Sequence, residues 1–306
     1  MYSTTYSTSH GCLRIISINT MFWEGVNFWI YQQNMPRDPS GVLAFLVAEL
    51  QLAEDNGERA WIIGHIPPGR SDALHDYSSY VDQVVQRYDA TIAAMFWGHT
   101  HRDQFEISYS DYSNQTAANA KVVGYIAPSL TPTSGNPNFR VYSIDPVTFD
   151  VLDYTVYYAN LTSPTYQDGP RFEKYYSAKQ AYGSLLHPQV TAEHAELSPA
   201  FWHNITELFE NDDAVFQEYV ARKQRGWEYA PCTGTCKTDE LCQLRSAQSQ
   251  FACMTPSASL RKRDDEAQTF FSPAVSECSH STMVGVLHAM SADLGALKDR
   301  VTDLMG

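Results

Sequence analysis

Three histidines stand where two apolar runs end. His65 follows residues 60–64, while His99 and His101 follow residues 92–97, and both runs have the composition of buried strands. In extended backbone, residues i and i+2 point the same way, so His99 and His101 are expected to project toward one site. Parallel α/β sheets place ligand sites at the carboxyl ends of their strands, and neutral imidazole is a common zinc ligand. We therefore predict that the three histidines converge on a metal site.

Other titratable side chains are not assigned to this site. Asp72, His75, Asp76 and Asp103 lie near the histidines in sequence, but nothing in their spacing places them among the ligands. Three neutral imidazoles can hold one zinc ion with water in the fourth position, whereas two closely spaced divalent ions need an anionic bridge. Six histidines are interpreted as surface or packing residues: His75, His187, His194, His203, His280 and His288.

The cysteines and the sequons indicate an oxidising compartment. Four of the six cysteines fall within 22 residues, with the spacing C-x3-C-x5-C-x10-C. A structural zinc site prefers closer pairs, so this cluster favours disulfides. Sequons at Asn114, Asn160 and Asn204 predict glycosylation and support a secreted protein. Cys12 and Cys278 remain, either as free thiols or as partners of each other. The first residues lack the charged and apolar regions of a signal peptide.

Periodicity indicates the elements that position the histidines. Strands are predicted at residues 13–19, 60–64, 92–97, 104–109, 121–127, 139–144 and 151–158. One helix is predicted to open with Asp38 as N-cap and Pro39 in its first turn, and a second at residues 80–88. Alternating helices and strands that pass into consecutive strands favour an α/β sandwich with a mixed sheet, which we assign to residues 1–160.

The pattern beyond residue 160 is different. Helices are predicted at residues 171–182, 199–209 and 213–223, so residues 161–254 are assigned to a helical subdomain that ends in the cysteine cluster. A Ser-rich, charged linker is predicted to follow, and apolar residues then recur every three or four positions from Leu287 to Leu304. Residues 255–306 are therefore read as a linker and an amphipathic tail helix, either docked or self-associating.

Composition excludes some classes of partner. The 306 residues contain 21 Lys and Arg against 35 Asp and Glu, a formal net charge of −14. No basic stripe is available for a nucleic-acid backbone. No apolar run approaches the ~20 residues needed to span a bilayer.

Longer stretches around the histidines resemble a known family. IIGHIPPG at 62–69 and FWGHTHRDQFEI at 96–107 resemble the last two metal-binding blocks of the calcineurin-like metallophosphoesterases. The flanks narrow the resemblance to the acid sphingomyelinase branch: LRIISINTMFW at 13–23, LVAELQLAEDNG at 46–57, NPNFRVYSID at 136–145 and PCTGTC at 231–236. The resemblance covers residues 11–254. It implies the C-terminal half of an αββα sandwich with mixed sheets, followed by a helical subdomain.

The resemblance also implies roles for particular residues. His65, His99 and His101 are implied ligands of a dinuclear zinc site, with His65 and His99 on one ion and His101 on the other. The implied disulfides are Cys232–Cys236 and Cys242–Cys253. The implied activity is hydrolysis of sphingomyelin to ceramide and phosphocholine, outside the cell or in a lysosome-like or vacuole-like compartment. Contact with membranes would be peripheral.

Three blocks of the family pattern do not occur in the 306 residues. These are D-x-H, G-D-x-x-D and G-N-H-[DE], which supply the bridging Asp, further ligands and the catalytic His. We expect the chain to start after them, to bind at most one zinc ion and to be inactive alone. Without that half of the domain, strands 13–19 and 60–64 are expected to expose an unpaired edge and an apolar face.

Two alternative functions remain open. The chain is alternatively a hydrolase of nucleotide or other small phosphodiesters, because the metal-binding blocks are shared and the substrate pocket lies mostly elsewhere. Residues 130–136 also lack a Tyr that relatives often carry near that pocket, which leaves the headgroup open. The second alternative is a catalytically inert, secreted binding fragment.

Overall fold

The computed structural model describes residues 1–32, 36–133 and 135–253. The predicted linker and tail helix lie outside these residues, as do Cys278, His280 and His288. No helix in the described part of the chain is long and apolar enough to cross a membrane.

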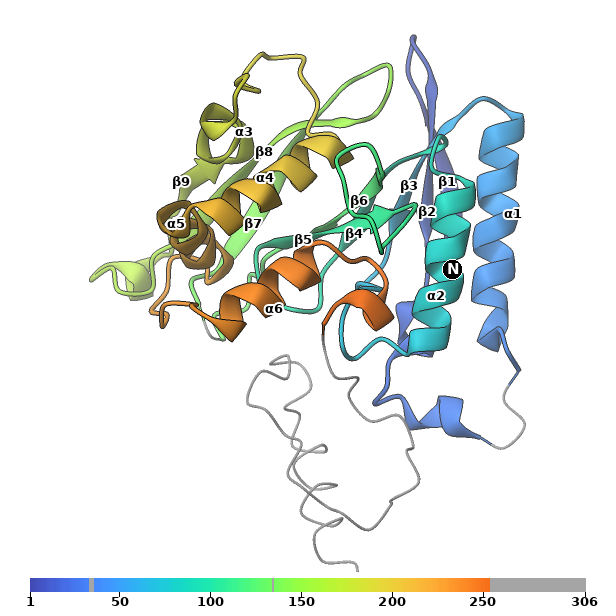
Figure 1. The fold of residues 1–306 in the computed structure, drawn as a ribbon, viewed down its shortest axis with the longest axis horizontal. Coiled ribbons are helices and arrows are strands. Elements are labelled where there is room, and N and C mark those ends of the chain that lie inside the picture. Colours follow the sequence, from blue (N-terminus) through green and yellow to red (C-terminus); the bar gives the residue numbers. More distant parts are fainter. Residues whose placement is uncertain (33–35, 134, 254–306) are drawn as a thin grey trace, which may run out of the picture. The chain divides into compact units, whose positions relative to one another are not determined.

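A six-stranded mixed sheet forms the centre of the fold, with the strand order β1-β2-β3-β4-β6-β5 (Figure 1). The strands are β1 (Tyr2–Ser7), β2 (Cys12–Ser17), β3 (Arg59–Ile63), β4 (Ile92–Trp97), β5 (Gln104–Tyr109) and β6 (Ala120–Ile126). The four inner strands β2, β3, β4 and β6 run parallel, while β1 and β5 pair antiparallel at the two edges. The carboxyl ends of β3 and β4, which precede the predicted metal ligands, therefore lie side by side.

The expectation of an unpaired edge at residues 13–19 and 60–64 was wrong. β3 is an inner strand, and β2 is covered by β1 over the register Tyr2↔Ser17 to Ser7↔Cys12. β1 is rich in Tyr and Thr, which favour strands, and the turn after it closes through a 2.8 Å hydrogen bond from the Thr8 N–H to the Gly11 carbonyl. Residues 2–7 are not among the strands predicted from the sequence.

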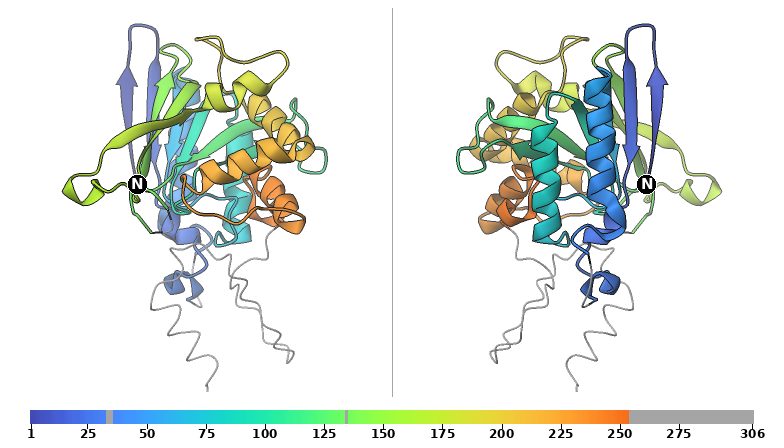
Figure 2. Two further views of the ribbon diagram at one scale, coloured as in Figure 1. Left: turned by 90° about the vertical axis from the view of Figure 1, so that its left-hand side faces the viewer. Right: turned by 90° about the vertical axis from the view of Figure 1, so that its right-hand side faces the viewer.

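Two helices cover one face of this sheet, α1 (Val42–Asp55) and α2 (His75–Arg87) (Figure 2). Leu46 and Leu50 of α1 are fully buried in one apolar cluster with Ile16 and Ile62. The predicted start of α1 needs correction, because Pro39–Gly41 forms a separate 3-10 turn. The Asp38 carboxylate nevertheless caps α1, since it accepts the N–H groups of Leu43 and Ala44, each over 2.9 Å.

A second, antiparallel sheet lies on the other side of the first. It consists of β7 (Asn138–Ile144), β8 (Val151–Ala159) and β9 (Phe172–Ser177) in that order. The helix predicted at residues 171–182 was wrong, because this stretch forms β9 and a single turn, α3 (Ala178–Ala181). Aromatic cross-strand contacts decide this, since the Phe172 and Tyr175 rings lie 5.1 and 5.0 Å from those of Phe139 and Tyr158.

Three further helices complete this side of the fold: α4 (Pro199–Asn211), α5 (Asp213–Lys223) and α6 (Thr235–Leu244). The first two match the predicted helices at residues 199–209 and 213–223. Trp202 of α4 is fully buried against the Tyr125 ring of β6 and the Tyr154 ring of β8. The disulfides Cys232–Cys236 and Cys242–Cys253 confirm the implied pairing. The fold is the expected mixed α/β arrangement of a partial metallophosphoesterase domain.

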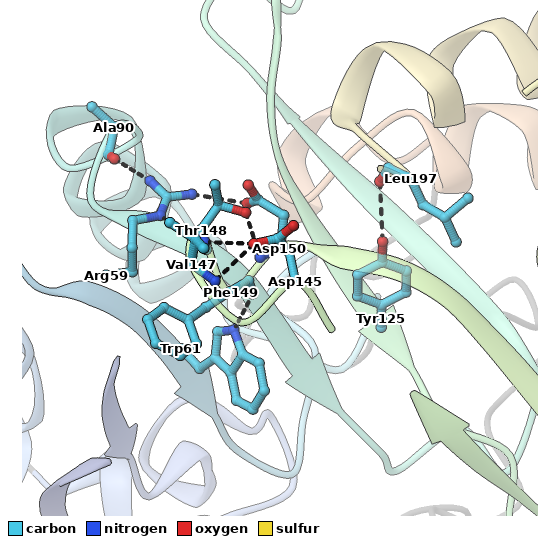
Figure 3. A network of polar contacts seen from close by, with 10 residues as sticks. All are labelled: Arg59, Trp61, Ala90, Tyr125, Asp145, Val147, Thr148, Phe149, Asp150 and Leu197. Atoms are coloured by element: carbon cyan, nitrogen blue, oxygen red, sulfur yellow. Dashed lines mark hydrogen bonds and ion pairs between the residues drawn. The ribbon is translucent and has the colours of Figure 1, made fainter. Parts of the chain in front are cut away.

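The turn between β7 and β8 bonds to the amino end of β3 and so connects the two sheets (Figure 3). The Arg59 guanidinium forms a 2.9 Å ion pair with Asp150 and donates to the Thr148 carbonyl over 3.0 Å, and the Trp61 indole donates to the Phe149 carbonyl over 3.0 Å. An apolar cavity of about 360 Å³ remains beside this turn, lined mainly by Tyr6, Leu13, Ile15, Trp61, Pro146 and Phe149. The expected apolar face of β2 and β3 is therefore covered only in part, since this cavity remains against it.

Candidate metal centre

Two imidazoles meet where the neighbouring strands β3 and β4 end. His65 and His99 each stand two residues beyond their strand, and the Gly98 N–H donates to the His65 carbonyl over 2.9 Å. His65 Nε2 lies 3.4 Å from His99 Nδ1. The predicted convergence of the two Gly-His motifs is thus confirmed, while a role for these histidines as metal ligands stays a prediction.

Close packing explains the glycine before His65. A Cβ atom at Gly64 would lie 2.6 Å from the Trp97 ring and 2.7 Å from the methyl group of Thr20. The Thr20 hydroxyl oxygen accepts the N–H groups of His65 and Ile66 over 3.3 and 2.8 Å. The segment after β2 therefore fixes the backbone that carries His65.

The backbone that carries His101 has a different conformation from the extended one predicted. His99 and His101 have φ values of 72° and 57°, so the backbone is left-handed there and the alternation of an extended strand does not apply. β4 has already ended at Trp97. His101 is half-buried, and its convergence with His65 and His99 stays a prediction.

Two acidic residues that sequence analysis did not assign lie against His99. The His99 Nε2 atom contacts the Asp72 carboxylate, and Glu24, Asp72 and His99 each offer a ligand atom within 4.8 Å of the others. All three side chains are buried. The spacing of Asp72 from the histidines shows no pattern that marks it as a ligand. Neither Asp72 nor Glu24 is among the metal ligands predicted from the sequence.

Backbone contacts between distant segments bring these acidic residues in. The Gly25 N–H donates to the Asp72 carbonyl and the Leu74 N–H to the Trp23 carbonyl, each over 2.7 Å. One signal for Glu24 was available in the sequence, since it is the only charged residue among residues 20–31. The other acidic candidates play different parts: Asp76 lies in the first turn of α2, and Asp103 forms a buried ion pair with Arg140.

Burial and charge set the protonation of the cluster. Burial alone disfavours the charged form of Asp72, but the hydrogen bond and charge of His99 outweigh it and lower the pKa of Asp72. The same contact outweighs burial at His99 and raises its pKa. Burial lowers the pKa of His65, so its imidazole is neutral and can donate a lone pair. Burial raises the pKa of Glu24.

The donor set fits a divalent metal ion. Two zinc ligands at 2.0–2.1 Å in tetrahedral geometry stand about 3.3 Å apart, close to the 3.4 Å between His65 Nε2 and His99 Nδ1. The opposite nitrogen of His99 faces Asp72, and a carboxylate in that place commonly orients a ligating histidine. Glu24 and Asp72 add carboxylate oxygens on that second side. Among the described residues, Glu24, Asp72 and His99 therefore form a buried group with nitrogen and oxygen ligands, and the exposed His65 offers a further nitrogen on the opposite side of the His99 ring.

The mixed α/β fold matches that of a partial metallophosphoesterase domain. No family model matches the chain. It is 36% identical over 239 residues to sphingomyelin phosphodiesterase 1 of Caenorhabditis elegans. The matched region covers 76% of this chain and 39% of that protein. It is 36% identical over 244 residues to human sphingomyelin phosphodiesterase, or 78% of this chain and 36% of that protein. The chain belongs to the sphingomyelin phosphodiesterase family.

The match is extensive for this chain but partial for its relatives. The chain spans less than two fifths of the length of both sphingomyelin phosphodiesterases. A rat relative, named cyclic GMP-AMP phosphodiesterase SMPDL3A, is 29% identical over 76% of this chain and 52% of its own length.

Proposed function

We propose that this chain supplies zinc ligands to a secreted or lysosomal phosphodiesterase that cleaves sphingomyelin to ceramide and phosphocholine. The observation that carries the proposal is the 3.4 Å separation of His65 Nε2 and His99 Nδ1, which suits two ligands of one zinc ion. Family membership supports the reaction class, and two disulfides support an oxidising compartment.

The chain's own residues would do three things in such a site. His65, whose pKa is lowered by partial desolvation and by the neighbouring His99, presents a lone pair. Asp72 holds the Nε2 side of His99, so that Nδ1 faces His65. His101 is proposed as a further ligand, which the family resemblance assigns to a second ion. Bound zinc would lower the pKa of a coordinated water and so supply a nucleophile at neutral pH.

Zinc binding and hydrolysis test the proposal separately. Isothermal titration of the metal-free chain with zinc should show one site, which His65→Ala and His99→Ala weaken at least tenfold. His75→Ala, at the start of α2, serves as the control and should bind as the wild type does. Undiminished zinc binding by both His65→Ala and His99→Ala would refute the assignment of these ligands.

Hydrolysis assays distinguish the remaining functions. Sphingomyelin and a chromogenic phosphodiester are incubated with the 306-residue chain, with and without zinc. We expect little or no turnover by these residues alone, as the absent sequence blocks suggest. Zinc binding without turnover of either substrate would fit the inert binding fragment. Zinc-dependent turnover that disappears in His99→Ala would show that the chain is active by itself.

A second candidate substrate class is nucleotide phosphodiesters. The rat relative whose name specifies cyclic GMP-AMP favours this possibility, since it matches the same share of the chain as the nematode sphingomyelin phosphodiesterase. Turnover of a cyclic dinucleotide but not of sphingomyelin would favour this second candidate over the first.

A further inference from the structure

The last described residues of the chain pack against the loop that carries His65. They are residues 245–253, which we call the 245–253 segment, and they lie beside α2 (Figure 1). A Cβ atom at Gly69 would overlap the carbonyl oxygen of Ser246. The backbone of the loop, residues 65–70, is therefore in direct contact with a part of the chain that is distant in sequence.

Ser78 of α2 joins the 245–253 segment to this loop. The Ser78 hydroxyl donates to the Pro68 carbonyl over 2.7 Å and accepts the Ser249 N–H over 2.8 Å. Ser78 is 1% exposed, so water does not compete for either bond. The hydroxyl spends its one proton on the loop and a lone pair on the segment. Alanine at residue 78 would break both bonds at once.

The 245–253 segment is itself held on its other sides. The Ala247 N–H donates to the Ile107 carbonyl over 3.0 Å, on the outer edge of β5. The Phe251 ring stacks on the Tyr112 ring, with the ring centroids 4.8 Å apart. The disulfide Cys242–Cys253 ties the end of the segment back to α6. Ser78 therefore connects the loop to a support that is fixed independently of it.

The loop needs such a support to place His65. Its two prolines have no backbone N–H, so they cannot bond to a neighbouring strand as donors. The Gly69 N–H bonds to Glu106, and Ser78 supplies a second contact through the preceding residue. Metal ligands must be held within about 0.5 Å of their productive geometry. A loosened loop would therefore disturb the separation between His65 and His99.

We propose that Ser78 is a positioning residue of the candidate metal centre. It transfers the support of the 245–253 segment to the loop that carries His65, so that zinc affinity depends on the Ser78 hydroxyl and on the disulfide Cys242–Cys253. The inference rests on the proposed function, because it takes His65 as a zinc ligand. Ser78 acts through Pro68, three residues after His65.

Zinc titration of the 306-residue chain tests the role of Ser78. Ser78→Ala should weaken zinc binding about three- to tenfold, the loss expected when a hydrogen bond that positions a ligand is removed. The matched control is Ser79→Ala, since the Ser79 hydroxyl belongs to the next residue of α2 and bonds to Gln83 of the same helix. This control should bind zinc as the wild type does.

Replacing the disulfide tests the support itself. Cys242→Ala combined with Cys253→Ala should weaken zinc binding by a similar factor. Cys232→Ala combined with Cys236→Ala removes the other disulfide and should leave zinc affinity unchanged. Alanine replaces chemical reduction here, because free thiolates bind zinc themselves. Both double variants lose global stability, so the titrations are made well below the melting temperatures, where each chain is folded.

Amide hydrogen exchange of the metal-free chain separates this inference from the proposed function. The Ile66 and Gly69 amides should exchange faster in Ser78→Ala than in Ser79→Ala. Wild-type exchange at both amides, or wild-type zinc affinity in Ser78→Ala, would overturn the role of Ser78 and leave the zinc ligands as assigned. Faster exchange in a chain whose wild type binds no zinc would count against the proposed function and support the link that Ser78 makes.

Discussion

The backbone N–H of Gly69 donates a 3.2 Å hydrogen bond to the carboxyl group of Glu106. This contact joins the loop that begins at His65 to the edge strand β5. Glu106 is fully buried, and its second oxygen has no hydrogen-bond partner in the described part of the chain. Burial raises the pKa of Glu106 to about 8, although the positive charge of Arg70 opposes the shift. A carboxyl group that is protonated near neutral pH therefore lies beneath the loop of the candidate metal centre.

Glu106 should make stability depend on pH. Its pKa is 4.5 when unperturbed and about 8 in the fold, so the folded chain holds a proton that the unfolded chain releases. The resulting stabilisation is complete below about pH 4.5 and is lost as the pH rises through about 8. Each pKa unit corresponds to about 1.4 kcal/mol. Thermal unfolding followed by circular dichroism should show a melting temperature that falls between about pH 5 and about pH 9.

Glu106→Gln should flatten this pH dependence, because the amide does not titrate. Glu173→Gln, which changes an exposed carboxylate on β9, is the control and should keep the wild-type slope. A Glu106→Gln profile as steep as that of the wild type would show that Glu106 is not the group responsible.

Gly69→Ala should destabilise the fold and weaken zinc binding. A Cβ atom at residue 69 would overlap the Ser246 carbonyl oxygen and come within 2.5 Å of the Glu106 carboxyl group. We expect a loss of about 1–3 kcal/mol in the free energy of unfolding, measured in urea. Gly169→Ala is the control, since nothing lies within 4 Å of its Cβ position. Equal stability of Gly69→Ala and the wild type would mean that the segment around Ser246 does not hold the loop in place.

Arg140→Met should be strongly destabilising. Arg140 and Asp103 form an ion pair with side chains 1% exposed, and Asp103 also accepts the Tyr176 hydroxyl over 2.8 Å. Removing the cation leaves a buried carboxylate uncompensated, at a cost of about 3–5 kcal/mol in the free energy of unfolding. Arg87→Met breaks the pair with Glu54, in which the Arg87 side chain is 57% exposed, and should cost far less because water screens that pair. Similar losses in the two variants would contradict this reasoning.

Asp72→Asn and Glu24→Gln should affect zinc binding differently. If zinc lies between His65 and the Nδ1 atom of His99, Asp72 orients His99 and its replacement should weaken zinc binding about 10–100-fold. Glu24→Gln should then have a smaller effect. Isothermal titration of both variants measures this order. Loss of binding in Glu24→Gln together with normal binding in His65→Ala would place the ion among Glu24, Asp72 and the Nε2 atom of His99 instead.

The local sequence was enough to locate the two strands that precede the predicted histidines. Short apolar runs that end at Gly64 and Gly98 mark β3 and β4, and their parallel pairing brings His65 and His99 together. These features depend on residues adjacent in the chain and on general rules of sheet geometry, so they can be read without a structure. The disulfide pairing was predicted only through the family resemblance, because four cysteines allow three pairings.

Tertiary packing decided the structural features that could not be predicted from the sequence or were predicted wrongly. Asp72 and Glu24 join His99 because two segments some 50 residues apart in the chain bond through their backbones, which no local spacing encodes. Residues 172–177 form a strand because their aromatic rings pack against β7 and β8, overriding a helical pattern. Residues 2–7 form a strand because they pair antiparallel with the free edge of β2. The sequence by itself determined that His65 and His99 meet, and the packing of distant segments decided which acidic side chains lie against His99.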